Sequence, residues 1–191
     1  MSDASRLIAF LDASVLYSAP LRDFLMHLAV RDLFAARWSD RVHEEWIAAL
    51  LRNRRELTQE QLARTRRLMD ENINDALVSG YEHIIAQLTL PDADDRHVLA
   101  AAIHGGANII VTVNLRDFPA DRLAAHGIAA LHPDTFICRI LENEPDEAVA
   151  ALRQLHHDLK DPPIAMDQLL TGLARIGLTK TVTELRRRME G

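Results

Sequence analysis

Cysteine is nearly absent from this 191-residue sequence, and long apolar runs are absent altogether. The single cysteine, Cys138, excludes an intramolecular disulfide and any zinc site built from several cysteines. No apolar run approaches the roughly 18–20 residues that a membrane span needs, and the first residues lack the apolar core of a signal peptide. We therefore expect a cytoplasmic protein that does not associate with membranes.

Positive charge is in the minority. The 22 lysines and arginines are outnumbered by 28 aspartates and glutamates, which gives a net charge of −6. This argues against a protein that coats nucleic acid through its overall charge, although an enzyme can still bind nucleic acid through a local basic surface. Hydrophobic residues make up 48% of the chain, a proportion typical of folded globular proteins.

Short β-branched or apolar runs alternate with longer helical patterns over most of the chain. This alternation predicts an α/β sandwich with a mainly parallel central sheet. Ser39 and the pair Thr58 and Gln61 are typical helix-capping residues, and Gly105–Gly106 suits the end of a helix. Strands are predicted at residues 7–11, 34–38, 76–78, 108–113 and 129–131, and helices at 21–30, 40–51, 58–71 and from about 95 to 105.

The character of the sequence changes after Leu141. The segment Glu142–Asp146 contains a proline among polar residues and is typical of a junction. Helices are predicted beyond it at residues 146–159, 166–176 and 178–189. We therefore predict a domain over residues 1–141 and a helical C-terminal extension over residues 142–191.

Acidic residues follow the predicted strands or begin the helices after them. They are Asp12, Glu45, Asp94, Asp95 and Asp117. Sites in parallel α/β sheets form at the carboxyl ends of the strands, so these side chains can converge. Converging carboxylates need protons or cations to neutralise them. Oxygen ligands without a cysteine or histidine cluster favour Mg²⁺ or Mn²⁺, and one or two such ions can drive phosphodiester hydrolysis without a protein nucleophile.

Each acid also has a structural interpretation. Asp92 fits a helix N-cap better than a metal ligand. Asp95 could simply place a negative charge at the start of a helix, where the helix dipole stabilises it. Glu45 has an acidic neighbour, Glu44, and either could face solvent. Asp12 could end its strand in a hydrogen-bonded turn. The joint placement of the acids is therefore stronger evidence than any one residue.

Four segments resemble the motifs of PIN domains, in the family order. The first is a strand ending in Asp and followed by Ser-Val-Leu, and the second is a Ser-capped helix that carries a Glu. The third is an Asp heading an alanine-rich helix, and the fourth is a strand followed by Thr-x-Asn-x-x-Asp-Phe. These segments are Phe10–Leu16, Ser39–Trp46, Asp95–Ala102 and Val111–Phe118, and the resemblance covers about residues 7–138.

The resemblance implies a parallel sheet between helices, an acidic pocket that holds Mg²⁺ or Mn²⁺, and hydrolysis of phosphodiester bonds in RNA. It also implies roles by position. Many relatives carry an acid where this chain has Asn114, which places more weight on Asp117. The implied catalytic and metal-binding residues are Asp12, Glu45, Asp95 and Asp117, with Asp94 as the alternative to Asp95, and the implied supporting residues are Ser14, Thr112 and Asn114.

Stand-alone bacterial proteins of this family are often VapC-like toxins that a small antitoxin inhibits. The resemblance therefore implies an RNA substrate and a cognate antitoxin as partners. A second copy of the chain, in a homodimer, is a further expected partner. The extension lies outside the compact toxin core, and dimerisation and antitoxin contact are both open as its role.

One stretch is locally basic. Six arginines, against Glu56 and Glu60, give residues 52–67 a net charge of +4. The functional interpretation is an RNA-binding rim beside the pocket, and the alternative is a solvated helical hairpin. The arginines are Arg52, Arg54, Arg55, Arg64, Arg66 and Arg67. Trp38, Trp46 and Cys138 are interpreted as core residues, and His97 as a neighbour of the pocket.

Other functions fit the sequence less well. A haloacid-dehalogenase-like phosphatase needs a second Asp where this chain has Ser14, and a downstream Lys, but the first lysine is Lys160. A non-catalytic PIN-like module that binds RNA or protein would be expected to lose one or more acids. A DNA-directed nuclease stays open, because the residues that would read the 2′-hydroxyl cannot be placed from sequence.

Overall fold

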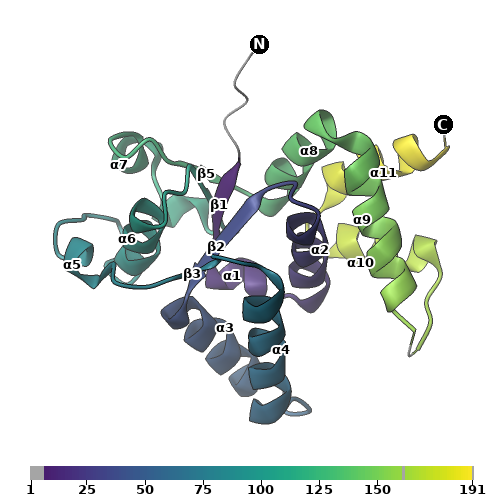
Figure 1. The fold of residues 1–191 in the computed structure, drawn as a ribbon, viewed down its shortest axis with the longest axis horizontal. Coiled ribbons are helices and arrows are strands. Elements are labelled where there is room, and N and C mark those ends of the chain that lie inside the picture. The colour runs from purple at the N-terminus through teal and green to yellow at the C-terminus, as the bar shows by residue number, and fades with distance from the viewer. Residues whose placement is uncertain (1–6, 161, 191) are drawn as a thin grey trace.

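The computed structural model describes residues 7–160 and 162–190. Five strands form one sheet in the order β3-β2-β1-β4-β5, and all neighbouring strands are parallel. This confirms the predicted α/β fold with a parallel sheet followed by C-terminal helices (Figure 1). The strands are β1 (Ile8–Leu11), β2 (Ala35–Ser39), β3 (Leu77–Val78), β4 (Ile109–Val111) and β5 (Ala129–Leu131).

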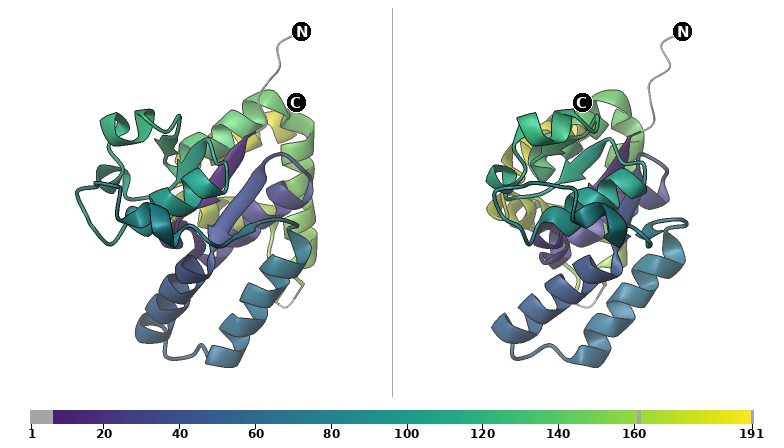
Figure 2. Two further views of the ribbon diagram at one scale, coloured as in Figure 1. Left: turned by 60° about the vertical axis from the view of Figure 1, so that its left-hand side comes forward. Right: turned by 90° about the vertical axis from the view of Figure 1, so that its left-hand side faces the viewer.

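Helices cover both faces of the sheet. Helix α6 packs against β1, β2 and β4, while α2 contacts the C-terminal helices on the other side of the molecule (Figure 2). The helices are α1 (Ala13–Leu16), α2 (Ala19–Val30), α3 (Asp40–Asn53), α4 (Gln59–Asn72), α5 (Glu82–Ile85), α6 (Arg96–His104), α7 (Ala120–Ala124), α8 (Pro133–Asn143), α9 (Pro145–Asp158), α10 (Met166–Arg175) and α11 (Thr179–Glu190). None of the helices in the described ranges combines the length and apolar character needed to cross a membrane.

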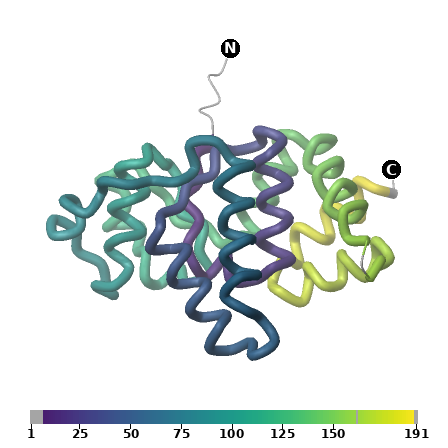
Figure 3. The backbone as a smooth tube through the Cα atoms, turned by 60° about the horizontal axis from the view of Figure 1, so that its bottom comes forward, coloured from purple at the N-terminus to yellow at the C-terminus, as the bar shows by residue number. Residues whose placement is uncertain are grey.

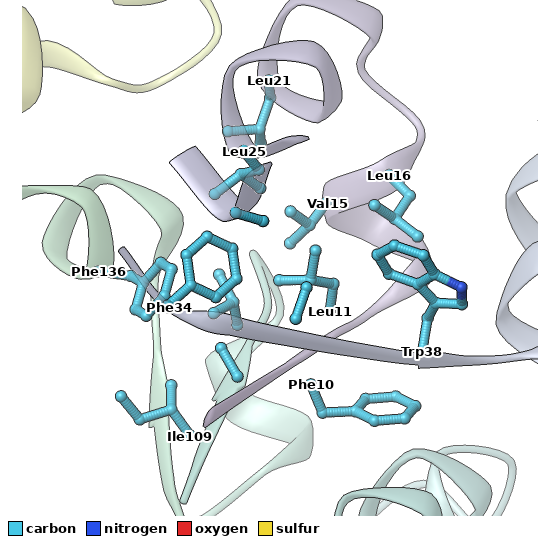
Figure 4. Packing of buried hydrophobic residues seen from close by; sticks show 14 of the residues in the cluster. Phe10, Leu11, Val15, Leu16, Leu21, Leu25, Phe34, Trp38, Ile109 and Phe136 are labelled. Atoms are coloured by element: carbon cyan, nitrogen blue, oxygen red, sulfur yellow. The ribbon is translucent and has the colours of Figure 1, made fainter. Parts of the chain in front are cut away.

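The central strands are buried on both faces. Figure 4 shows Leu11 and Trp38 on the same side as Val15 and Leu16, whereas Phe10 points the opposite way. This alternation follows from strand geometry, because successive side chains point to opposite faces. Phe10, Leu11 and Trp38 are fully buried, so the sheet forms the middle of the core and its strand ends are held firmly in place.

The predicted helix caps are present. The Ser39 hydroxyl accepts a hydrogen bond from the backbone N–H of Val42 (3.3 Å) and begins α3. Thr58 and Gln61 form a reciprocal capping box at the start of α4. Figure 3 shows α4 lying beside α2, with the loop between α3 and α4 extending beyond the rest of the molecule.

A polar network fixes α3 against β2 and α4. The Asp70 carboxylate accepts a hydrogen bond from Trp38 Nε1 (2.8 Å) and lies 3.2 Å from His43 Nε2. Trp46 Nε1 donates to His43 Nδ1 (3.0 Å), so the histidine carries its hydrogen on Nε2 and is neutral. Burial lowers the pKa of His43, an effect that Asp70 partly offsets. Both tryptophans are core residues, as predicted.

Helix α8 was not expected from the sequence. It joins the sheet domain to the C-terminal helices, because it contacts both α9 and α11. The buried Asp134 accepts hydrogen bonds from the backbone N–H groups of Thr181 (2.8 Å) and Lys180 (3.1 Å), at the start of α11. Cys138 is only partly buried, and its Sγ lies 3.7 Å from Thr181 Oγ1.

Candidate active site

Asp12 lies at the carboxyl end of β1 and is only 7% exposed. Its Oδ1 accepts a hydrogen bond from the backbone N–H of Ala13 (2.8 Å). Its Oδ2 accepts from the hydroxyls of Ser14 (2.6 Å) and Thr112 (2.9 Å). The carboxylate is thus held in one orientation at the edge of the sheet, as the interpretation of Ser14 and Thr112 as supporting residues requires.

The ends of β1 and β4 meet at this point because the two strands are parallel neighbours. The Ser14 and Thr112 hydroxyls lie 3.3 Å apart. The backbone N–H of Asn114 donates to Thr112 Oγ1 (3.0 Å), and that of Val113 donates to Ser14 Oγ (3.3 Å). Asn114 itself is exposed, and the contact it makes here is from its backbone N–H to the Thr112 hydroxyl.

Asp95 immediately precedes α6 and is partly buried. Burial and the negative charges of Asp12, Asp117 and Asp92 raise the pKa of Asp95 to about 6, and His97 lowers it slightly. The structure therefore brings Asp12, Asp95 and Asp117 into one electrostatic environment. Asp117 belongs to the short 3-10 turn Leu115–Asp117 after β4 and is also partly buried.

The loop before α6 carries two further acids, Asp92 and Asp94, and the charge of Asp92 also acts on Asp95. Asp94 is exposed, and its backbone N–H donates to the Asp92 carboxylate (2.8 Å). Asp92 was expected to cap the helix, but α6 begins at Arg96 with Asp95 in the capping position. The Asp92 carboxylate instead accepts the hydrogen bond from Asp94, two residues further on, and so closes a turn before the helix.

Glu45 projects from α3 towards α6, whereas its neighbour Glu44 is exposed. Glu45 Oε1 lies 2.9 Å from His97 Nε2 and 3.3 Å from Arg41 Nε. His97 lies in the first turn of α6 and is 1% exposed. The sequence pattern predicts His97 near the acidic residues but does not pair it with Glu45, because the contact joins helices that are distant in the chain.

The donor set suits a hard divalent cation. Asp12, Asp95 and Asp117 offer only oxygen ligands, and their mutual repulsion is what a cation would relieve. Over residues 7–160 and 162–190, however, no three acidic, histidine or cysteine side chains are arranged to hold one ion directly. Mg²⁺ usually keeps several water ligands and takes one or two carboxylates, so direct contact with three side chains is not required.

The six arginines of the basic stretch lie at the end of α3, in the following loop and on α4. Arg54 pairs with Glu56, and Arg66 pairs with Asp40 and Asp70. The others are exposed and form no ion pair within the described part of the chain: Arg52, Arg55, Arg64 and Arg67. Two of the six are thus used within the protein, and four are available to solvent.

Comparison with known proteins gives two family matches. Residues 9–116 match the PIN domain, and residues 133–187 match the VapC50 C-terminal domain. The chain is 39% identical over 98 residues to a Mycobacterium tuberculosis protein described as "Putative ribonuclease VapC50". This alignment covers 51% of the chain and 57% of that relative, so the chain spans little more than half of the relative's length. No solved structure matched the chain.

Proposed function

Because the chain belongs to the PIN-domain family, in a longer VapC-like form with a C-terminal helical domain, we propose that it is a metal-dependent endoribonuclease. It would hydrolyse phosphodiester bonds of RNA. The observation that carries this proposal is that the negative charges of Asp12, at the end of β1, and Asp117, after β4, act on the carboxylate of Asp95 at the start of α6.

The proposed metal-binding residues are Asp12, Asp95, Asp117 and Glu45, and the proposed ion is Mg²⁺ or Mn²⁺. A bound divalent cation would supply an activated water and stabilise the charge that develops on the phosphodiester oxygens. Asp12 is the best oriented of these ligands, since three hydrogen bonds fix its carboxylate. Asp94 is a weaker candidate than Asp95, because it is exposed and lies outside the cluster.

The protein's own contribution is orientation. Ser14 and Thr112 hold Asp12, and the backbone N–H of Asn114 holds the Thr112 hydroxyl. These contacts keep the carboxylate in place before substrate arrives, so that no reorganisation is needed when the phosphodiester binds. Arg52, Arg55, Arg64 and Arg67 are proposed to contact RNA phosphates, because they are exposed and not used in ion pairs within the described chain.

The biological role that we propose is the toxin of a toxin–antitoxin pair, with residues 1–141 as the nuclease and 142–191 as the extension. This rests on the likeness to a relative named as a VapC ribonuclease. A cognate antitoxin would inhibit the enzyme by presenting an arginine or lysine to the acidic pocket, since crowded carboxylates without metal favour a cation. A homodimer is proposed as the assembly.

The test is cleavage of end-labelled single-stranded RNA, structured tRNA and single-stranded DNA with Mg²⁺, Mn²⁺ or EDTA. We expect RNA to be cut with either ion, EDTA to stop the reaction and Asp12→Asn to be inactive. Cleavage of DNA alone would redirect the proposal to a DNA nuclease. Binding of RNA without cleavage, by wild type and Asp12→Asn alike, would contradict it in favour of a non-catalytic module.

A further inference from the structure

His97 is a buried histidine whose two ring nitrogens have very different surroundings. Nε2 lies 2.9 Å from the Glu45 carboxylate. Nδ1 is buried and has no hydrogen-bond partner among the residues that the structure describes. Close approach to a carboxylate requires Nε2 to carry a hydrogen. The neutral ring then leaves only a lone pair on Nδ1, whereas a charged ring would bury an unpaired N–H.

An unpartnered nitrogen in the interior is unfavourable. An apolar side chain of similar size, such as leucine, would fill the same space without burying an unpartnered nitrogen. The contact that the imidazole adds, and that leucine could not make, is the one to Glu45. Packing alone therefore does not explain a histidine at this position.

The contact joins two helices that are distant in the chain. Glu45 belongs to α3, and His97 lies two residues after Asp95, in the first turn of α6. The glutamate is otherwise poorly restrained, because its side chain is 38% exposed and its other contact is the exposed Arg41. An exposed ion pair of this kind orients a flexible side chain only weakly.

We propose that His97 is a positioning residue that holds the Glu45 carboxylate on the Asp95 side of the pocket, ready to bind a divalent cation. This inference rests on the proposed function. His97 itself does not bind the ion, because its one donating nitrogen faces Glu45 and its other nitrogen is enclosed. It acts as the hydrogen-bonding partners of metal-binding carboxylates do in other proteins, by fixing the orientation of a ligand.

The experiment measures Mn²⁺ binding, without substrate, from the electron paramagnetic resonance signal of the free ion. His97→Leu should weaken binding about 10- to 100-fold, the usual effect of losing an orienting partner. His97→Gln should retain most of the affinity, because its amide N–H reaches about as far as Nε2. His97→Asn should not, because its amide is too short. If His97→Leu does not fold, the difference in Mn²⁺ affinity between His97→Gln and His97→Asn tests the proposal.

A double-mutant cycle separates positioning from a structural role. If His97 acts through Glu45, His97→Leu should cause no further loss of Mn²⁺ affinity in a Glu45→Gln background. His43→Leu is the matched control, since His43 is equally buried and faces its own carboxylate, Asp70, at 3.2 Å. It should lower stability and leave Mn²⁺ affinity unchanged.

Unchanged Mn²⁺ affinity in His97→Leu, or equal losses with and without Glu45, would overturn the positioning role. Asp12→Asn distinguishes this from failure of the proposed function. If Asp12→Asn loses Mn²⁺ binding and His97→Leu keeps it, only the positioning role is wrong. If wild type binds no Mn²⁺, the proposed metal site and the role of His97 are both overturned.

Discussion

Two buried aspartates of nearly equal exposure have opposite surroundings. Asp12, at the carboxyl end of β1, is 7% exposed, and Asp134, at the junction of α8 and α11, is 6% exposed. Asp134 accepts two backbone N–H groups at the first turn of α11. Asp12 accepts one backbone N–H and two hydroxyls, and its negative charge acts on a second carboxylate, Asp95.

The difference is the one expected between a structural carboxylate and the functional carboxylate that we propose. At the start of α11, the Asp134 carboxylate accepts hydrogen bonds from N–H groups that have no partner within the helix. Its negative charge also lies at the positive end of the helix dipole, so it stabilises the fold. In the pocket, like charges face one another and the fold gains little from their approach. Burial alone therefore does not distinguish the two carboxylates, whereas the sign of the charges around them does.

The largest expected effect is on catalysis. Asp12→Asn should reduce RNA cleavage by more than about 100-fold, because losing a metal ligand should cost more than losing a residue that only orients one. Its thermal unfolding temperature without metal should be unchanged or higher, since the change removes a negative charge from a crowded pocket. Circular dichroism checks the fold beside the cleavage assay. A variant that is inactive because it is unfolded would remove the contrast with Asp134.

The converse is expected at the junction of α8 and α11. Asp134→Ala should lower the free energy of unfolding by about 1–3 kcal/mol, because the buried N–H of Thr181 and the partly buried N–H of Lys180 lose their acceptor. Urea unfolding measures this, and Asp134→Asn, which keeps one acceptor oxygen, should lose less. Cleavage per folded molecule should be unchanged. A large loss of activity in a folded Asp134→Ala protein would show that the two regions are coupled.

Arginines should show a similar but smaller difference between residues that bind RNA and residues that form ion pairs within the protein. Arg64 and Arg67 form no ion pair within the described residues, whereas Arg187 pairs with Glu184 at 2.6 Å. Arg64→Ala and Arg67→Ala should weaken RNA binding, and each should reduce the salt dependence of the binding constant by about 0.7 in a log–log plot. Filter binding with the Asp12→Asn protein measures this. Arg187→Ala is the control and should change neither quantity.

The smallest expected effect is the pH dependence contributed by His43. Its pKa is lowered in the folded state by burial, and Asp70, Arg66 and Asp40 are the charged groups that act on it. The unfolded chain therefore binds a proton more readily, and stability should fall as the pH drops below about 6.5, the ordinary histidine value. Urea unfolding at pH 7.5 and 5.5 measures this. The drop should be smaller in His43→Gln, and an equal drop would contradict the assignment.

Local signals were enough to predict much of the fold. The capped starts of α3 and α4 depend on residues three positions apart, and the strand before Asp12 is a continuous apolar run. Helix α8 was missed although its signals were present. Pro133 stands at its first position, and Phe136 and Ile140 are spaced for one buried face. The change in composition after Leu141 falls inside this helix, so the composition does not mark the helix as one element.

Only the part of the candidate site that lies at the ends of neighbouring parallel strands could be predicted from the sequence. Asp12 and Thr112 meet because parallel neighbouring strands end at the same edge, which a sequence pattern can indicate. The choice between Glu44 and Glu45 depends on how α3 is rotated, and the partner of Glu45 is His97, on a distant helix. Such contacts depend on tertiary packing, which no spacing of residues along the sequence predicts. The metal-binding roles of these residues stay predictions.

The central claim is that the crowded carboxylates form a divalent-metal site, and calorimetric titration of the metal-free protein with Mn²⁺ tests it most directly. The account predicts saturable binding to wild type, retained in Asp134→Asn and lost in Asp12→Asn, with all three proteins folded. Absence of saturable binding to wild type, or equal binding to wild type and Asp12→Asn, would contradict the claim.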